Sequence, residues 1–159
     1  MNMKILGAFA MVALLAACNN PPPPPPVAAP QPMAVAPQGP VPGSQEDLVA
    51  NVGDRVFFAF NKSNLSSDAR ATLDRQSGWL AKYPQNNVQV AGNCDERGTE
   101  EYNIALGQRR ANHARDYLVA KGVAGTRITT ISYGKDHPVA MGSNEDAWKQ
   151  NRNAITSVR

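Results

Sequence analysis

The sequence lacks an apolar run long enough to cross a bilayer, and it carries few charges. Its longest uncharged apolar run, residues 5–17, has 13 residues, whereas a membrane-spanning helix needs about 20. A multi-pass membrane protein is therefore excluded. Only 18% of the residues are charged and the formal net charge is +3. The chain thus lacks the dense basic patch of nucleic-acid-binding domains, and we predict no nucleic-acid partner.

Cysteine is nearly absent, because the chain has only Cys18 and Cys94. Four residues offer metal-ligating side chains within a short stretch: Cys94, Asp95, Glu96 and His113. Their spacing matches no zinc motif, so we expect solvated or packed side chains there. The sequence predicts no metal and no other cofactor.

A thiol nucleophile is the enzymatic alternative. Cys94 could act with His113 or His137, as cysteine does in cell-wall peptidases, but the spacing fits no catalytic signature. We therefore predict a protein that is not an enzyme, and keep a Cys94-dependent hydrolase as the rival. If Cys18 carries lipid, Cys94 has no partner within the chain. We then expect a buried thiol, with intermolecular pairing left open.

Residues 1–17 have the pattern of a secretory signal. Lys4 supplies a positive charge ahead of the apolar run, which ends in Leu-Ala-Ala before Cys18. A cysteine at this position resembles the lipobox of bacterial lipoproteins, which implies acylation of Cys18, including palmitate. Asn19 stands where Asp would favour retention in the inner membrane. We therefore expect a lipid anchor on the periplasmic face of the outer membrane.

Proline is concentrated in one place: 11 of the 13 prolines lie between Pro21 and Pro42. Proline fixes φ and lacks an N–H donor, so this segment is predicted to form polyproline II rather than a helix or a strand. About 25 such residues would reach roughly 80 Å. We interpret residues 18–45 as a lipidated tether. A ligand for SH3-type domains is the alternative, but such domains are mainly intracellular.

Residues 46–159 are enough for one domain. Segments in which apolar and polar residues alternate, or which are rich in β-branched residues, predict strands. Apolar residues spaced by three and four predict helices. The expected strands are 52–60, 88–92, 127–133 and 154–158, and the expected helices are 66–83, 101–121 and 145–150. The order β-α-β-α-β-(α)-β predicts an α/β sandwich with helices packed on a small mixed sheet.

A candidate site lies between the second expected strand and the helix after it. Asp95 follows the strand, while Asn103, Leu106 and Arg110 share one stripe of the helix and Arg109 is turned about 100° away. Asp95 and Arg110 could face one cleft and hold the ammonium and the carboxylate of a zwitterion. The alternative from spacing alone is an Asp95–Arg110 salt bridge that fixes the loop.

The same region carries a recognisable pattern. Asp-Glu-Arg-Gly-Thr at 95–99, Tyr-Asn-Ile-Ala-Leu-Gly at 102–107 and Arg-Arg-Ala-Asn at 109–112 resemble the OmpA-like peptidoglycan-binding family. Ile-Ser-Tyr-Gly-Lys at 131–135, Pro138 and Trp148 add to this resemblance. It extends over residues 52–159 and is greatest to the lipoproteins of the Tol–Pal system.

The resemblance implies a ligand, partners and site residues. The ligand is peptidoglycan, held through the diaminopimelate of its stem peptides. The implied partners are TolB and other Tol proteins, in envelope integrity and in outer-membrane constriction during cell division. A general cell-wall anchor without Tol partners is the alternative. By position, the implied site residues are Asp95, Arg110, Leu106 for the aliphatic part, Asn103 as a brace of the loop, and Phe60 and Asn61.

The chain departs from the family pattern at four positions. Asn61 replaces the usual Asp, which removes one negative partner for an ammonium, so we expect Asn61→Asp to tighten binding. Asn93 stands in place of His, Glu100 in place of Pro, and Asn153 in place of a second Arg. We expect these three changes to affect loop stiffness and the surface.

Overall fold

The structure is a computed structural model that describes residues 39–159. The predicted signal peptide at 1–17, the lipidation site at Cys18 and most of the proline-rich segment lie outside the described residues. Within 39–159, none of the helices is long and apolar enough to cross a membrane.

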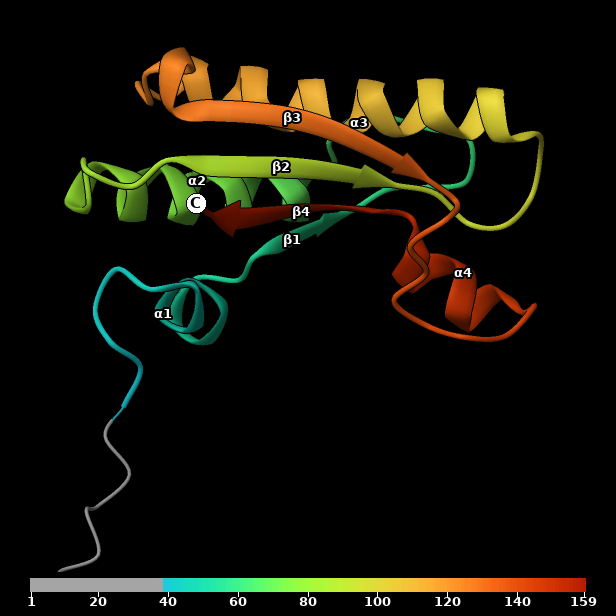
Figure 1. The fold of residues 1–159 in the computed structure, drawn as a ribbon, viewed down its shortest axis with the longest axis horizontal. Coiled ribbons are helices and arrows are strands. Elements are labelled where there is room, and N and C mark those ends of the chain that lie inside the picture. Colours follow the sequence, from blue (N-terminus) through green and yellow to red (C-terminus); the bar gives the residue numbers. More distant parts are fainter. Residues whose placement is uncertain (1–38) are drawn as a thin grey trace, which may run out of the picture. The chain divides into compact units, whose positions relative to one another are not determined.

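A four-stranded mixed sheet forms the centre of the domain, in the order β1-β4-β2-β3 (Figure 1). Strand β4 (Asn153–Val158) is antiparallel to both β1 (Arg55–Phe57) and β2 (Val88–Asn93). Strand β2 runs parallel to β3 (Ile128–Gly134). These strands confirm the predicted α/β class with a small mixed sheet.

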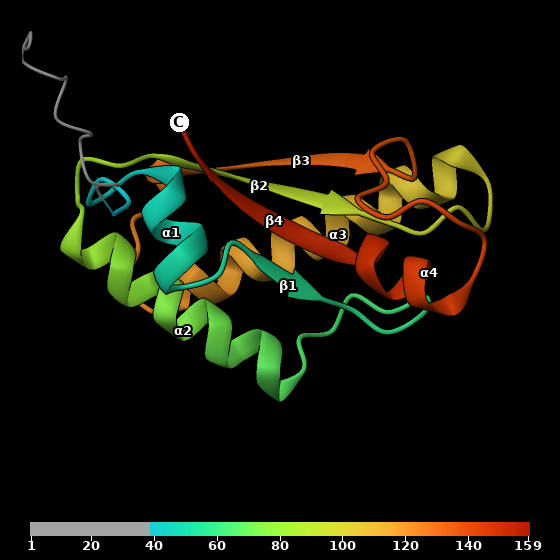
Figure 2. The same ribbon diagram turned by 90° about the horizontal axis from the view of Figure 1, so that it is seen from below.

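Two long helices, α2 (Ser67–Lys82) and α3 (Glu100–Ala120), cover one face of this sheet. The short helices α1 (Gln45–Asn51) and α4 (Glu145–Asn151) lie near β1 and β4, toward opposite ends of the sheet (Figures 1 and 2). Leu48 of α1 belongs to the same core as α2. A 3-10 turn, Gly125–Arg127, leads into β3. Helix α3 connects the two parallel strands, so its first turn lies next to the end of β2.

The hydrophobic core fills the space between the sheet and the two long helices. Every second residue of a strand faces the same side, and the buried strand residues include Val56, Val88, Val90 and Ala154. They pack against residues that recur about once per turn on the helices: Ala69, Leu73, Leu80, Ala111, Ala114 and Leu118. The core therefore fixes the position of α3 over β2 and β3.

Helix ends agree with the sequence signals. Ser66 caps α2 by accepting a hydrogen bond from the Ala69 N–H, as its position before the apolar stripe predicts. Gly122 follows α3 with φ +96°; its N–H bonds to the Val119 carbonyl, and the Val123 N–H bonds to the Leu118 carbonyl. This Schellman pattern ends the helix within one residue of the predicted end at residue 121.

The first predicted strand is wrong in length, because only Arg55–Phe57 of residues 52–60 is strand. Gly53, at φ +92°, turns the chain before the strand. After Phe58 the chain turns again, with a hydrogen bond from the Lys62 N–H to the Ala59 carbonyl. This second turn brings carbonyl groups toward α3, where they help to form the candidate site.

Helix α1 was not predicted from the sequence, and it begins one residue before the predicted start of the domain. Seven residues are too few to show helical periodicity clearly. A signal is nevertheless present: Ser44 caps the helix, and Asp47 stands three residues later, as in a capping box. Asp47 also accepts a 2.9 Å hydrogen bond from the Trp79 indole, which attaches α1 to α2.

Candidate functional site

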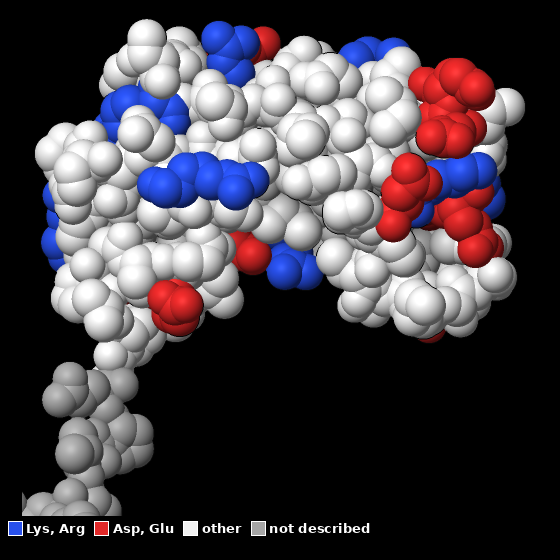
Figure 3. Space-filling view, viewed as in Figure 1, with Lys and Arg blue, Asp and Glu red and all other residues white. Residues whose placement is uncertain are grey.

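A cavity of about 150 Å³ opens between the end of β2, the first turns of α3 and the turn after β1. All six predicted site residues line it: Phe60, Asn61, Asp95, Asn103, Leu106 and Arg110. Sequence reasoning did not assign four further lining residues to the site: Cys94, Arg97, Gly98 and Tyr102. Charged side chains gather at this end of the domain, at the right of Figure 3, whereas the middle of that face is largely uncharged.

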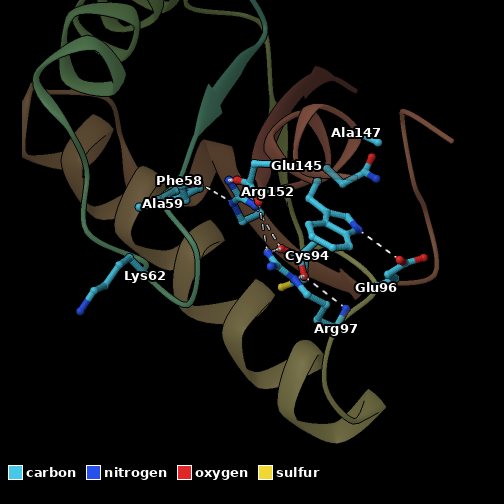
Figure 4. A network of polar contacts seen from close by, with 12 residues as sticks. Phe58, Ala59, Lys62, Cys94, Glu96, Arg97, Glu145, Ala147 and Arg152 are labelled. Carbon is cyan, nitrogen blue, oxygen red and sulfur yellow. Dashed lines mark hydrogen bonds and ion pairs between the residues drawn. The ribbon is translucent and has the colours of Figure 1, made fainter. Parts of the chain in front are cut away.

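Asp95 is held by two arginines from separate parts of the chain, Arg97 in the loop after β2 and Arg152 between α4 and β4; both arginines are labelled in Figure 4. Its carboxylate accepts a hydrogen bond of 2.6 Å from Arg97 Nη2 and one of 3.2 Å from Arg152 Nη1. The Arg97 backbone N–H and Nε each lie 3.2 Å from the other carboxylate oxygen. Burial alone raises the pKa of Asp95, but these hydrogen bonds outweigh it and leave the pKa below its usual value. Asp95 is therefore a buried anion at neutral pH.

Arg110 is 0% exposed and has no carboxylate partner among the described residues. Nε donates to the Lys62 carbonyl (2.9 Å), Nη1 to the Asn93 carbonyl (2.7 Å) and to Cys94 Sγ (3.3 Å), and Nη2 to the Ala59 carbonyl (3.3 Å). Burial lowers the pKa of its guanidinium. The alternative of a direct Asp95–Arg110 salt bridge is wrong, since Asp95 pairs with Arg97 and Arg152 instead.

The loop after β2 is attached to α4 by stacked side chains. The Arg97 guanidinium lies 4.0 Å from the ring centroid of Phe60 and 4.0 Å from that of Trp148. The Trp148 indole donates a 3.1 Å hydrogen bond to Glu96. Glu145, on α4, pairs with Arg152 at 2.7 Å. Phe60 is thus part of an aromatic wall at the rim of the cavity.

Three more residues shape the cavity. Asn103 donates to the carbonyls of Arg97 (2.9 Å) and Thr99 (3.1 Å), which is the bracing contact expected of it. Leu106 is buried and supplies an apolar part of the lining. Asn61 has φ +55°, a left-handed conformation that Asn tolerates better than most residues, and its side chain accepts a hydrogen bond from the Tyr102 hydroxyl.

The Cys94 thiol faces the cavity but is almost fully buried. Its sulfur contacts Arg110 and the Asn103 carbonyl, and burial raises the pKa of the thiol. Neither histidine lines the cavity: His113 Nδ1 lies 2.6 Å from the Ser63 carbonyl, and His137 stacks on Tyr133. Across residues 39–159, no group of three or more His, Cys, Asp or Glu side chains is placed to hold a metal ion.

Two of the departures from the family pattern lie in the interior. Asn93 and Asn153 are buried on the neighbouring strands β2 and β4, and Asn93 Nδ2 donates a 2.8 Å hydrogen bond to Asn153 Oδ1. The expectation that they affect the surface is wrong, because both side chains are buried. Asn93 Oδ1 finds no donor among the described residues. Glu100, by contrast, is exposed in the first turn of α3.

Comparison with known proteins places the chain in a family. A family model described as the OmpA family matches residues 57–152. The peptidoglycan-associated lipoprotein of Rhizobium meliloti (strain 1021) is 56% identical over 115 residues, which are 72% of this chain and 65% of that protein. The protein of the same name from Mesorhizobium japonicum is 53% identical over 117 residues, which are 74% and 70% of the two chains. The match thus spans slightly less than two thirds of the first relative's length.

A solved structure agrees with these sequence relatives. The crystal structure of the peptidoglycan-associated lipoprotein from Burkholderia pseudomallei is similar, with a TM-score of 0.65 and 39% identity, over 67% of this chain and 90% of that one. Sequence, fold and family model therefore agree with the resemblance found in the motifs around Asp95 and Arg110. The chain belongs to the OmpA family, and within that family it resembles the peptidoglycan-associated lipoproteins.

Proposed function

We propose that this domain binds peptidoglycan non-covalently through the free amino-acid end of diaminopimelate in the stem peptides. One observation carries the proposal: Asp95 and Arg110 line the same cavity, and each still has its charge, yet they are not paired with each other. A buried guanidinium without an anionic partner is costly. A ligand with a carboxylate next to an ammonium would supply that anion and place its ammonium next to the Asp95 carboxylate, in exchange for one of the two arginines.

Each part of the ligand has a matching group. Arginine has five N–H donors, and four of those on Arg110 are used within the protein, which leaves one on Nη2 for the ligand carboxylate. Asp95 accepts from the ammonium. Leu106 packs against the aliphatic part of the ligand, with Phe60 at the rim, and Asn103 keeps the loop in place. The ligand's chain then leaves the cavity toward solvent.

The relatives support peptidoglycan as the source of this zwitterion, because the two sequence relatives and the solved structure are all named peptidoglycan-associated lipoproteins. We extend the proposal to the rest of the chain. Cys18 carries lipid in the outer membrane and the proline-rich segment after it forms the tether. The folded domain, which includes α1 from Gln45, holds the wall from the periplasmic side.

Within the same proposal the protein works with TolB and the other Tol proteins, in envelope integrity and in constriction of the outer membrane during division. A cell-wall anchor without Tol partners is the alternative. Co-purification of TolB with the full-length protein supports the role with the Tol proteins. If TolB does not co-purify although the protein still binds sacculi, the anchor without Tol partners is favoured.

We propose binding rather than hydrolysis. A cysteine nucleophile needs a thiolate and a nearby base, whereas the pKa of the Cys94 thiol is raised and the cavity contains no histidine. Purified protein should sediment with intact sacculi and release no soluble muropeptides. Asp95→Asn should remain in the supernatant, and Arg109→Gln, an exposed change next to Arg110, should sediment like the unmodified protein. Equal sedimentation of both variants would refute the site.

A further inference from the structure

The Asp95 carboxylate is fully occupied in the unliganded domain. A carboxylate accepts about four hydrogen bonds. Asp95 receives three from Arg97, through the backbone N–H, Nε and Nη2, and a fourth from Arg152 Nη1. A ligand ammonium therefore finds no open acceptor position on Asp95. One of the two guanidinium groups must leave before such a ligand binds.

The two arginines differ in how firmly they are held. The Arg152 side chain is only 5% exposed and has two further acceptors, the Phe58 carbonyl at 3.1 Å and Glu145 at 2.7 Å. The Arg97 side chain is 32% exposed and lines the cavity, and within residues 39–159 its one other ion-pair partner is Glu145, at 3.9 Å. Arg97 is the group that can move without opening the interior.

We propose that Arg97 is an internal counter-ion for Asp95 that the ligand's ammonium replaces. This inference rests on the proposed function, because it assigns a competing role to a residue of the same cavity. The ligand ammonium takes the place of Arg97 beside Asp95, so Arg152 is never the only cation that pairs with the buried carboxylate. The displaced guanidinium stays next to the Phe60 and Trp148 rings and turns toward Glu145, whose carboxylate is 48% exposed.

The exchange predicts that mutation of Arg97 changes the ligand affinity in the opposite direction to mutation of an ordinary binding residue. The ligand gains its contact with Asp95 only by breaking the contact between Arg97 and Asp95, so the net gain is the difference between two ion pairs. Removing the Arg97 charge removes the competitor. The affinity for a ligand with a free ammonium then rises, whereas removal of a residue that contacts the ligand lowers it.

The test is calorimetric titration of the full-length protein with meso-diaminopimelic acid. Arg97→Gln is expected to bind about five-fold more tightly than the unmodified protein, the size of a partly exposed ion pair. The matched control is Arg55→Gln, because Arg55 also pairs with a neighbouring aspartate, Asp54 at 3.1 Å, but lies outside the cavity. Unchanged or weaker binding by Arg97→Gln overturns the proposal.

A second measurement does not depend on any variant folding well. The Nε–H resonance of Arg97 reports its hydrogen bond to Asp95, and it should shift when the unmodified protein is saturated with diaminopimelic acid. The Nε–H of Arg110 keeps its bond to the Lys62 carbonyl, so its resonance should move less. A stationary Arg97 signal at saturation also overturns the proposal.

The two proposals can fail separately. If Asp95→Asn loses binding but Arg97→Gln gains none, only the counter-ion role is wrong. If the unmodified protein does not bind the probe, or Asp95→Asn binds it equally well, the proposed function fails and the counter-ion role fails with it.

Discussion

Asp95 and Arg110 line one cavity, yet neither neutralises the other: Asp95 is bound by Arg97 and Arg152, and Arg110 by backbone carbonyls and a thiol. Two opposite buried charges in one small space would ordinarily form an ion pair. Here the turn after β1 and the end of β2 hold Arg110 through its carbonyl partners and keep it away from Asp95. The separation leaves space for a ligand that carries both charges.

Asn61→Asp should strengthen ligand binding. Asn61 lines the cavity, and aspartate tolerates its left-handed conformation about as well as asparagine. A carboxylate there adds a charge-assisted contact with the ligand ammonium, so we expect about five-fold tighter binding of diaminopimelic acid by calorimetry. Asn64→Asp, an exposed change of the same charge outside the cavity, is the control. No difference between the two variants would argue against an ammonium near Asn61.

Asp47 should make the free energy of unfolding of the domain depend on pH in the acidic range. Hydrogen bonds from the Gly43 N–H, the Trp79 indole and Asn51 lower its pKa from 3.8 to about 2. Because the folded-state pKa is the lower one, this stabilisation is present above about pH 3.8 and is lost as the pH falls through about 2. Urea unfolding should show Asp47→Asn to be less stable than the unmodified protein at pH 7. That difference should shrink below pH 3.8, and a constant difference would contradict the assignment.

Gly92→Ala should destabilise the domain strongly. Helix α3 crosses β2 so closely that a Cβ on Gly92 would lie 1.8 Å from the Gly107 carbonyl oxygen. We expect a loss of about 3 kcal/mol or more in the free energy of unfolding. Gly78→Ala is the matched control, since Gly78 lies within α2 with nothing near its Cβ position. That change should stabilise by about 0.5–1 kcal/mol, and similar losses in both variants would rule out the close contact.

Cys94→Ser should leave wall binding nearly unchanged. A serine hydroxyl can keep both contacts of the thiol, accepting from Arg110 and donating to the Asn103 carbonyl. Because the serine keeps both contacts, sedimentation with sacculi should stay within about two-fold of the unmodified protein, a difference of about 0.4 kcal/mol. Release of muropeptides by the unmodified protein, abolished in Cys94→Ser, would instead establish the hydrolase.

The long elements of the fold could be predicted because their signals are local. The expected helix 66–83 has apolar residues spaced by three and four, and in α2 the stripe Ala69, Leu73, Gln76 and Leu80 is buried. The expected helix 101–121 ends one residue earlier, ahead of Gly122. The first strand was predicted too long, because aromatic residues just after the paired segment pack in the core or against the candidate site and do not extend the strand. Phe58 is buried in the core and Phe60 stacks on Arg97, although neither belongs to β1.

Six of the ten residues that line the candidate site could be predicted, but the ion pairs within it could not. Helical spacing placed Asn103, Leu106 and Arg110 on one face, and all three line the cavity. That Asp95 is bound by Arg97 and Arg152 depends on two separate parts of the chain, the loop after β2 and the residue just before β4. Spacing along one helix carries no information on such contacts. The buried Asn93–Asn153 pair escaped for the same reason, since it forms between strands 60 residues apart.

The most direct test is a structure of the protein bound to a peptide that contains diaminopimelate. We predict the ligand's free ammonium at about 3 Å from the Asp95 carboxylate and its carboxylate at about 3 Å from Arg110 Nη2. A ligand bound outside this cavity, or within it but with neither charged group at Asp95 and Arg110, would contradict the account.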